Sequence, residues 1–166
     1  MATRSSAEPR APERGDVIEF SFLWSHERAA GRLEGAKDRR CVIVAVLGGG
    51  RRVVVAPITG TEPNHDDKIA LPAGALGLSR PSWIVTSELN VSLWPGHDLR
   101  PAKQPCGAWW RYGRLSNPLR RRLAEALRTL VEAGQARSSL ELWRVEQEDV
   151  LPATSPIIQR KVMYPD

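Results

Sequence analysis

The sequence predicts a mainly β protein, a small twisted barrel of short strands followed by one C-terminal helix. Two apolar runs rich in β-branched residues, within residues 38–45 and 51–60, are joined by Gly48-Gly49-Gly50. Such runs joined by glycine are typical of a hairpin of two buried strands. Short strand patterns flank this hairpin, and leucines recur at helical spacing only in the last third of the chain.

The remaining strands are predicted from alternation and turn residues. Val17, Ile18, Phe20 and Phe22 alternate in part with polar residues, which favours a first strand. The polar segment from Trp24 to Lys37 is expected to be a long mobile loop, a place where function often lies. After the hairpin we expect a loop at 61–68, an edge-like strand at 69–72, a strand at 82–90 with a continuation at 91–94, and a turn at 95–98.

One helix is predicted after residue 116. Asn117 can cap it, Pro118 suits its first position, and Gly134 can close it. Its apolar face consists of Leu119, Leu123, Leu127, Leu130 and Val131. Arg120-Arg121-Arg122 fall in the first turn, where the helix dipole disfavours cations. This triplet is compatible with a solvated face or with an exposed anion-binding edge.

The 166 residues suggest one domain with tails. We expect a disordered N-terminal tail at 1–13, the barrel with its helix at 14–134, and an extension at 135–166. Within the extension, Leu140, Leu142, Trp143 and Val145 are expected to pack against the barrel or a partner subunit.

Charge and cysteine content narrow the class of protein. The net charge of +5 and the pI of about 9.8 favour anionic partners. The two cysteines, Cys41 and Cys106, imply no disulfide framework and fit a reducing compartment. Because no apolar run is long enough for a membrane span or a signal peptide, we expect no membrane partner and a cytoplasmic location.

Four segments together resemble a known family. They are Gly15-Asp16-Val17-Ile18, Lys37-Asp38-Arg39 before a Val-Ile-Val strand, Pro57-Ile58-Thr59, and Ser82-Trp83-Ile84-Val85-Thr86-Ser87-Glu88. Their order is similar to that in MazF/PemK-type toxins, over residues 14–132. The resemblance implies an SH3-like β-barrel, a homodimer, and cleavage of single-stranded RNA without metal or other cofactor. It also implies inhibition by an acidic antitoxin protein.

The resemblance assigns the catalytic arginine to Arg39 and a threonine of the site to Thr59. The family has an arginine-proline pair before the second strand, whereas this chain has Arg40 in the place of the proline. Either of the two guanidinium groups can therefore point into the groove. The chain after Gly134 is an extension beyond the usual length of the family.

The implied chemistry is attack of an RNA 2′-hydroxyl on the neighbouring phosphorus. Arg39 would stabilise the doubly anionic transition state, and Thr59 would hydrogen-bond a non-bridging oxygen. Two protons must move, and the candidate general acids and bases are His26, Glu27 and Glu34 in the loop before Arg39, and His65 after Thr59. The alternative is that these are solvated loop residues and a turn threonine.

RNA contacts are predicted from guanidinium groups and aromatic rings. Arg40 and Arg51 enter the two hairpin strands, and guanidinium is a natural partner of phosphate. The run from Trp109 to Arg114 interleaves aromatic and basic residues, so Trp110 and Arg111 are candidates for base stacking and phosphate contact. In the alternative interpretation, one of the tryptophans caps the barrel.

Two further predictions concern partners. The histidines and cysteines are not at metal-ligand spacing, so we expect no metal. The apolar residues Trp83, Leu89, Val91 and Trp94 exceed what one small barrel needs, which favours a homodimer. The competing function is a catalytically inactive barrel that binds RNA, DNA or a protein partner.

Overall fold

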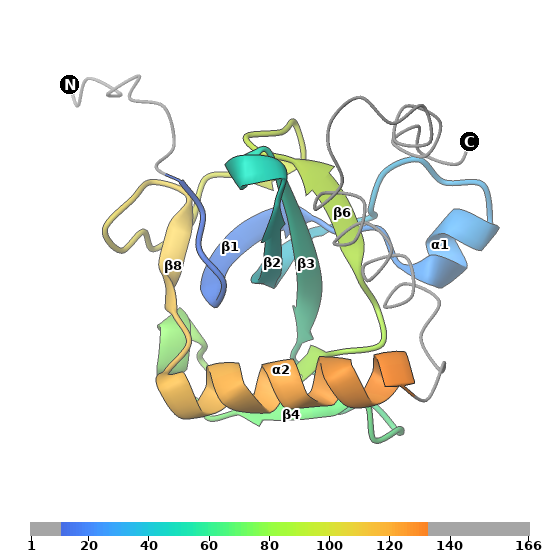
Figure 1. The fold of residues 1–166 in the computed structure, drawn as a ribbon, viewed down its shortest axis with the longest axis vertical. Coiled ribbons are helices and arrows are strands. Elements are labelled where there is room, and N and C mark those ends of the chain that lie inside the picture. Colours follow the sequence, from blue (N-terminus) through green and yellow to red (C-terminus); the bar gives the residue numbers. More distant parts are fainter. Residues whose placement is uncertain (1–10, 133–166) are drawn as a thin grey trace.

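A computed structural model describes residues 11–132. Eight strands form one antiparallel sheet system. They are β1 (Asp16–Ser21), β2 (Asp38–Leu47), β3 (Arg52–Thr59), β4 (Lys68–Leu71), β5 (Ser82–Val85), β6 (Asn90–Leu93), β7 (Leu99–Arg100) and β8 (Arg111–Arg114). Two α-helices accompany them, α1 (Ser25–Ala29) and α2 (Asn117–Glu132). The prediction of a mainly β chain with one C-terminal helix is confirmed (Figure 1).

The strand order is β4-β5-β3-β2-β1-β7, with β6 also on β3 and β8 also on β1. All pairs are antiparallel, both between neighbours in sequence such as β2 and β3 and between distant strands such as β1 and β8. The two end strands of this path, β4 and β7, are not paired with each other among residues 11–132. The path is therefore open, and closure into an SH3-like barrel stays a prediction.

The hairpin of β2 and β3 has apolar side chains on both faces. Val42 and Val44 pack into one core, whereas Cys41 and Ile43 pack into a second core with Trp110. The β2–β3 register shifts between Ile43 and Ala45, which marks a β-bulge. Because both faces are covered, the two runs are continuously apolar rather than alternating.

Helix α2 covers the first of these two cores. Leu123 and Leu130 are buried, and Leu119 and Leu127 pack against the same cluster. Figure 1 shows α2 lying across the lower ends of the central strands and in front of β4. The spacing of these leucines gives the helix its apolar face, as the sequence predicts.

Several boundaries differ from the sequence-based expectations. The loop expected from Trp24 to Lys37 contains helix α1, and the strand expected at 82–90 ends at Val85, with a turn before β6 begins at Asn90. Glu13, placed in the tail, pairs with Arg114 at 2.9 Å. The prediction of a disordered tail at residues 1–10 and the predictions for residues 133–166 lie outside the described residues. Within residues 11–132, no helix has both the length and the apolar character that a membrane span requires.

Candidate functional site

Arg39 lies near the start of β2, opposite Phe20 of β1. Its guanidinium carbon is 5.0 Å from the centre of the Trp24 ring. The Trp24 ring in turn stacks on His26, with 6.2 Å between ring centres and 28° between planes. The loop after β1 therefore brings His26 to the neighbourhood of Arg39, which sequence separation alone does not imply.

Thr59 ends β3 on the same face of the sheet as Arg39. Cys41 of β2 is paired with Pro57 of β3, and paired residues share a face. Arg39 and Thr59 are each two residues beyond that pair, so alternation returns both to that face. The Thr59 hydroxyl oxygen accepts a hydrogen bond from the Thr61 N–H at 3.2 Å, which leaves the hydroxyl proton free to be donated.

The Nε atom of Arg39 is buried and has no hydrogen-bond partner among the described residues. An unpartnered donor at the edge of a protein core is costly, and it calls for a water or a ligand group as partner. Within residues 11–132, no carboxylate lies within ion-pair distance of the Arg39 guanidinium. Its contacts are the Trp24 ring and the strand beneath it, so its charge is available to an anion.

The segment that carries Trp24 and His26 is anchored by hydrogen bonds to Asn90 of β6 and to Glu88 just before that strand. Asn90 of β6 accepts a hydrogen bond from the Leu23 N–H and donates one to the Leu23 carbonyl, both at 2.9 Å. Ser25 donates from both its N–H and its hydroxyl to the Glu88 carboxylate. These contacts fix the entry to α1, and with it the position of Trp24.

Glu27 closes the same loop from within. Its carboxylate accepts the Trp24 N–H at 3.1 Å and the Ala36 N–H at 3.3 Å. Burial opposes ionisation of this carboxyl, but the two backbone hydrogen bonds and the charges of Arg32 and His26 bring its pKa below the usual value. Glu27 is therefore an ionised structural group that holds the loop together.

Arg40 projects to the opposite face from Arg39. Its guanidinium carbon is 4.2 Å from the centre of the Tyr112 ring, and one of its nitrogens donates to the Gly77 carbonyl at 3.4 Å. Its Nε, like that of Arg39, is buried and unpartnered within residues 11–132. The two adjacent arginines thus face different surroundings, and only Arg39 shares a face with Thr59.

Beside Arg40 lies a buried acid–phenol pair. Glu19 is 4% exposed and accepts a hydrogen bond of 2.6 Å from the Tyr112 hydroxyl, with the Lys103 ammonium 4.0 Å away. Burial and the hydrogen bond to Glu19 raise the pKa of Tyr112. This pair ties β1 to β8, and the alternation pattern of β1 gave no sign of it.

We expect Tyr112→Phe to lower the free energy of unfolding by about 1–3 kcal/mol, because Glu19 would lose its closest donor while staying buried. The folded protein keeps the phenol proton after the unfolded chain has lost it, since the folded-state pKa is raised. That stabilisation is complete below pH ~10 and is lost as the pH rises further. Urea unfolding at neutral and alkaline pH measures both effects. A variant as stable as the wild type, with the same alkaline loss, would contradict this role.

Two proton-carrier candidates stay apart from Arg39 and Thr59. Glu34 is exposed in the segment before β2, and His65 is exposed in the loop between β3 and β4. Neither has a side-chain contact with Arg39 or Thr59 in the part of the chain that the structure describes. Glu27, also a candidate, holds the loop through its two backbone hydrogen bonds. His26 is the candidate that the fold connects to Arg39, through the Trp24 ring.

The predicted RNA-contact residues are also dispersed. Arg51 is at the hairpin tip, the far end of β2 from Arg39, and donates to the Gly48 carbonyl at 2.9 Å. Arg111 is half-buried and lies 3.6 Å from the Asp16 carboxylate. Trp110 is 1% exposed and packs edge-on against Trp94, with 4.8 Å between ring centres. The Trp110 ring therefore has no free face for a base, which fits the alternative of a tryptophan that caps the core.

Two residues near the site were missed by the sequence analysis. Trp24 was placed in the loop but not assigned a role, although it forms the surface on which Arg39 rests. The Arg80 guanidinium lies over Gly60, where an added Cβ would be 2.5 Å from one of its nitrogens. Glycine next to Thr59 is the one sequence signal that a bulky group approaches there.

The described residues contain no group of three potential metal ligands. Cys41 is buried, and burial raises the pKa of its thiol well above the usual value, so it stays neutral. The chemistry open to this site is electrostatic stabilisation of an anion, together with proton transfer by an imidazole. The chain matches no protein-family model, and none of the curated proteins compared with it is a significant relative.

Proposed function

We propose that this protein is a metal-independent endoribonuclease that cleaves single-stranded RNA. The observation that carries the proposal is the Arg39 end of the sheet, where an arginine with a buried, unpartnered Nε shares a face with Thr59. A preorganised cation in a partly water-excluded position suits a reaction whose transition state gains negative charge. The net charge of +5 supports an anionic substrate.

In the proposed mechanism, the 2′-oxygen attacks the adjacent phosphorus and the 5′-oxygen leaves, giving a 2′,3′-cyclic phosphate and a free 5′-hydroxyl. Arg39 donates to a non-bridging oxygen as charge develops there, and the Thr59 hydroxyl donates to the other. His26 takes the proton of the 2′-hydroxyl. Arg80, over Gly60, supplies a second cation beside Thr59. The 5′-oxygen receives its proton from water, because Glu34 and His65 are exposed on loops that stay apart from Arg39 and Thr59.

The finer parts of the resemblance belong to the same proposal. They are an SH3-like barrel, a homodimer, a cytoplasmic location, and a toxin–antitoxin pair in which an acidic antitoxin silences the nuclease. An acidic partner is supported by the strongly basic composition, because opposite charge favours association.

Cleavage of a long mRNA in the presence of a chelator tests the proposal directly. Fragments with cyclic phosphate ends are expected from the wild type. If the protein binds RNA but leaves it intact under these conditions, the function is that of an RNA-binding module. If it neither binds nor cleaves RNA, both functions fail.

We expect a homodimer in solution at micromolar concentration. Leu93 at 56% and Trp109 at 42% are exposed large apolar side chains, and such surfaces are more stable when covered. Three of the four residues that motivated the dimer are occupied within the subunit, since Leu89 is buried, Val91 packs against the first core and Trp94 packs on Trp110. Light scattering measures the mass. A monomer that still cleaves RNA would contradict the prediction.

A further inference from the structure

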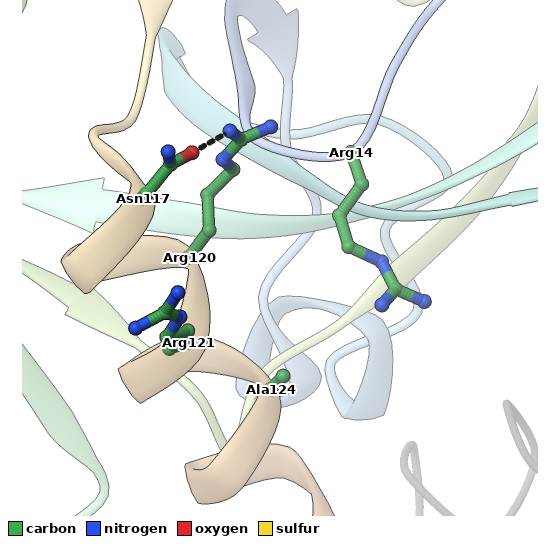
Figure 2. A pocket seen from close by; sticks show the side chains of 5 residues that line it. All are labelled: Arg14, Asn117, Arg120, Arg121 and Ala124. Atoms are coloured by element: carbon green, nitrogen blue, oxygen red, sulfur yellow. Dashed lines mark hydrogen bonds between the residues drawn. The ribbon is translucent and has the colours of Figure 1, made fainter.

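Three arginines line an open hollow of about 440 Å³ at the start of α2. Figure 2 shows Arg14 on the segment before β1, and Arg120, Arg121 and the small side chain of Ala124 on α2, with the three guanidinium groups pointing in different directions. Asn117 completes the lining. The lining contains no acidic residue, so like charges gather here without compensation.

Glu13 and Asp16, the acids nearest in sequence to Arg14, are engaged elsewhere. Arg114 pairs with Glu13 and with Asp16, at 2.9 Å in both cases, and Asp16 also lies near Arg111. Within residues 11–132, neither Arg14 nor Arg121 has a carboxylate within ion-pair distance. Their charges are therefore available to a ligand.

The third arginine is held in place. The Arg120 guanidinium donates to the Asn117 side-chain oxygen, as the dashed line in Figure 2 marks. Its aliphatic stem lies over Gly15, where an added Cβ would be 2.5 Å from the Arg120 Cδ. Gly15 has a φ of +92°, a conformation that other residues rarely adopt. The Arg120 side chain is thus held both at its guanidinium and along its aliphatic stem.

We propose that this hollow binds a phosphodiester group of single-stranded nucleic acid, as a subsite remote from Arg39. Guanidinium groups match phosphate in geometry and charge. An anion here would also offset the cost of placing arginines in the first turn of a helix. The inference rests on the proposed function in one respect, that the strand bound is the RNA cleaved at Arg39.

The two places lie at opposite ends of β1. Arg14 comes just before this strand, and Phe20 near its end opposes Arg39. At ~3.3 Å per residue, the strand separates them by roughly 20 Å. Because α2 covers the face of the sheet opposite Arg39, a strand bound at both places must pass around the edge of the sheet. Single-stranded nucleic acids commonly occupy sites of about 4–16 nucleotides on small β proteins, which is long enough for such a path.

The test uses a labelled 2′-deoxy oligonucleotide, which has no 2′-hydroxyl to react. In full-length protein, Arg14→Gln and Arg121→Gln are each expected to weaken binding several-fold. Each should also reduce the slope of log affinity against log salt by ~0.7, the amount for one lost contact to a single strand. Ala124→Glu, which places a negative charge in the hollow, should weaken binding at least as much. Arg128→Gln is the matched control, because Arg128 is an exposed arginine of the same helix outside the hollow.

Three outcomes would overturn the proposal. If Arg128→Gln lowers affinity and salt slope as much as Arg121→Gln, overall charge explains the effect. If the three hollow variants bind like the wild type, there is no subsite. A separate titration with inorganic phosphate, followed by amide NMR shifts of residues 117–124, distinguishes the source. Saturation by free phosphate without any shift from the oligonucleotide would reject nucleic acid as the ligand.

The failure of this inference and the failure of the nuclease proposal give different results. If the wild type never cleaves RNA but the hollow variants lose oligonucleotide binding, the subsite stands and the nuclease fails. If the wild type cleaves RNA and the hollow variants bind and cleave normally, the nuclease stands and the subsite fails.

Discussion

Replacing Arg39 by alanine is expected to lower the rate of RNA cleavage by about 10²–10³, the usual loss for one preorganised donor to a developing anion. The side chain rests on the surface of Trp24 and fills no core cavity, so the fold should persist. Single-turnover cleavage of a long RNA in chelator measures the rate, and circular dichroism checks the fold. RNA binding should also weaken, with a smaller dependence on salt.

Arg40→Ala is the matched control for this experiment. It removes the same charge from the adjacent position but from the other face of β2. Because Arg40 packs on Tyr112 and donates to the Gly77 carbonyl, its loss is expected to lower stability while cleavage stays within a few-fold of wild type. If instead Arg40→Ala abolishes cleavage and Arg39→Ala does not, Arg40 is the catalytic arginine. If both variants cleave normally, neither arginine serves the reaction.

The second large effect is expected at Trp110. Truncation to alanine removes one of the largest fully buried side chains, and we expect a loss of about 3–5 kcal/mol in the free energy of unfolding. Chemical denaturation measures the loss. Trp109→Ala is the control, since this neighbouring ring is 42% exposed and its loss should change stability by no more than ~0.5 kcal/mol. A Trp110→Ala variant that unfolds like the wild type but no longer binds RNA would restore the prediction of base stacking.

Much of the fold could be predicted because its signals are local. The glycine turn and the two β-branched runs locate the β2–β3 hairpin, and the spacing of leucines after Asn117 locates α2. The short strands β7 and β8 were missed. Leu99–Arg100 is too short for any periodic pattern, and Gly113 interrupts the second strand. Strands this short form because β1 offers them a partner, and the partner is far away in sequence.

The site was harder to predict because it depends on register and on packing across the sheet. Sequence leaves Arg39 and Arg40 equivalent, whereas pairing with β1 and β3 sends them to opposite faces. The contact between Trp24 and Arg39 depends on the position of Trp24, whose neighbours Leu23 and Ser25 are bonded to Asn90 and Glu88, which lie far away in sequence. Trp109 and Trp110 likewise look alike in the chain. The Trp94 ring packs against one side of Trp110, and this contact explains why Trp110 is buried while Trp109 is exposed.

The position of β1 has a consequence for how this chain forms during translation. β1 emerges early and pairs with β2 soon afterwards, but its other edge is paired with β7 and β8, which are made much later. Until the ribosome has released residues 99–114, the N–H and C=O groups along that edge of β1 have no native partner. A nascent chain in this state is open to pairing with another strand or to binding by a chaperone. Mutations that weaken β8 should therefore lower the yield of folded protein, even where the free energy of unfolding of the folded protein changes little.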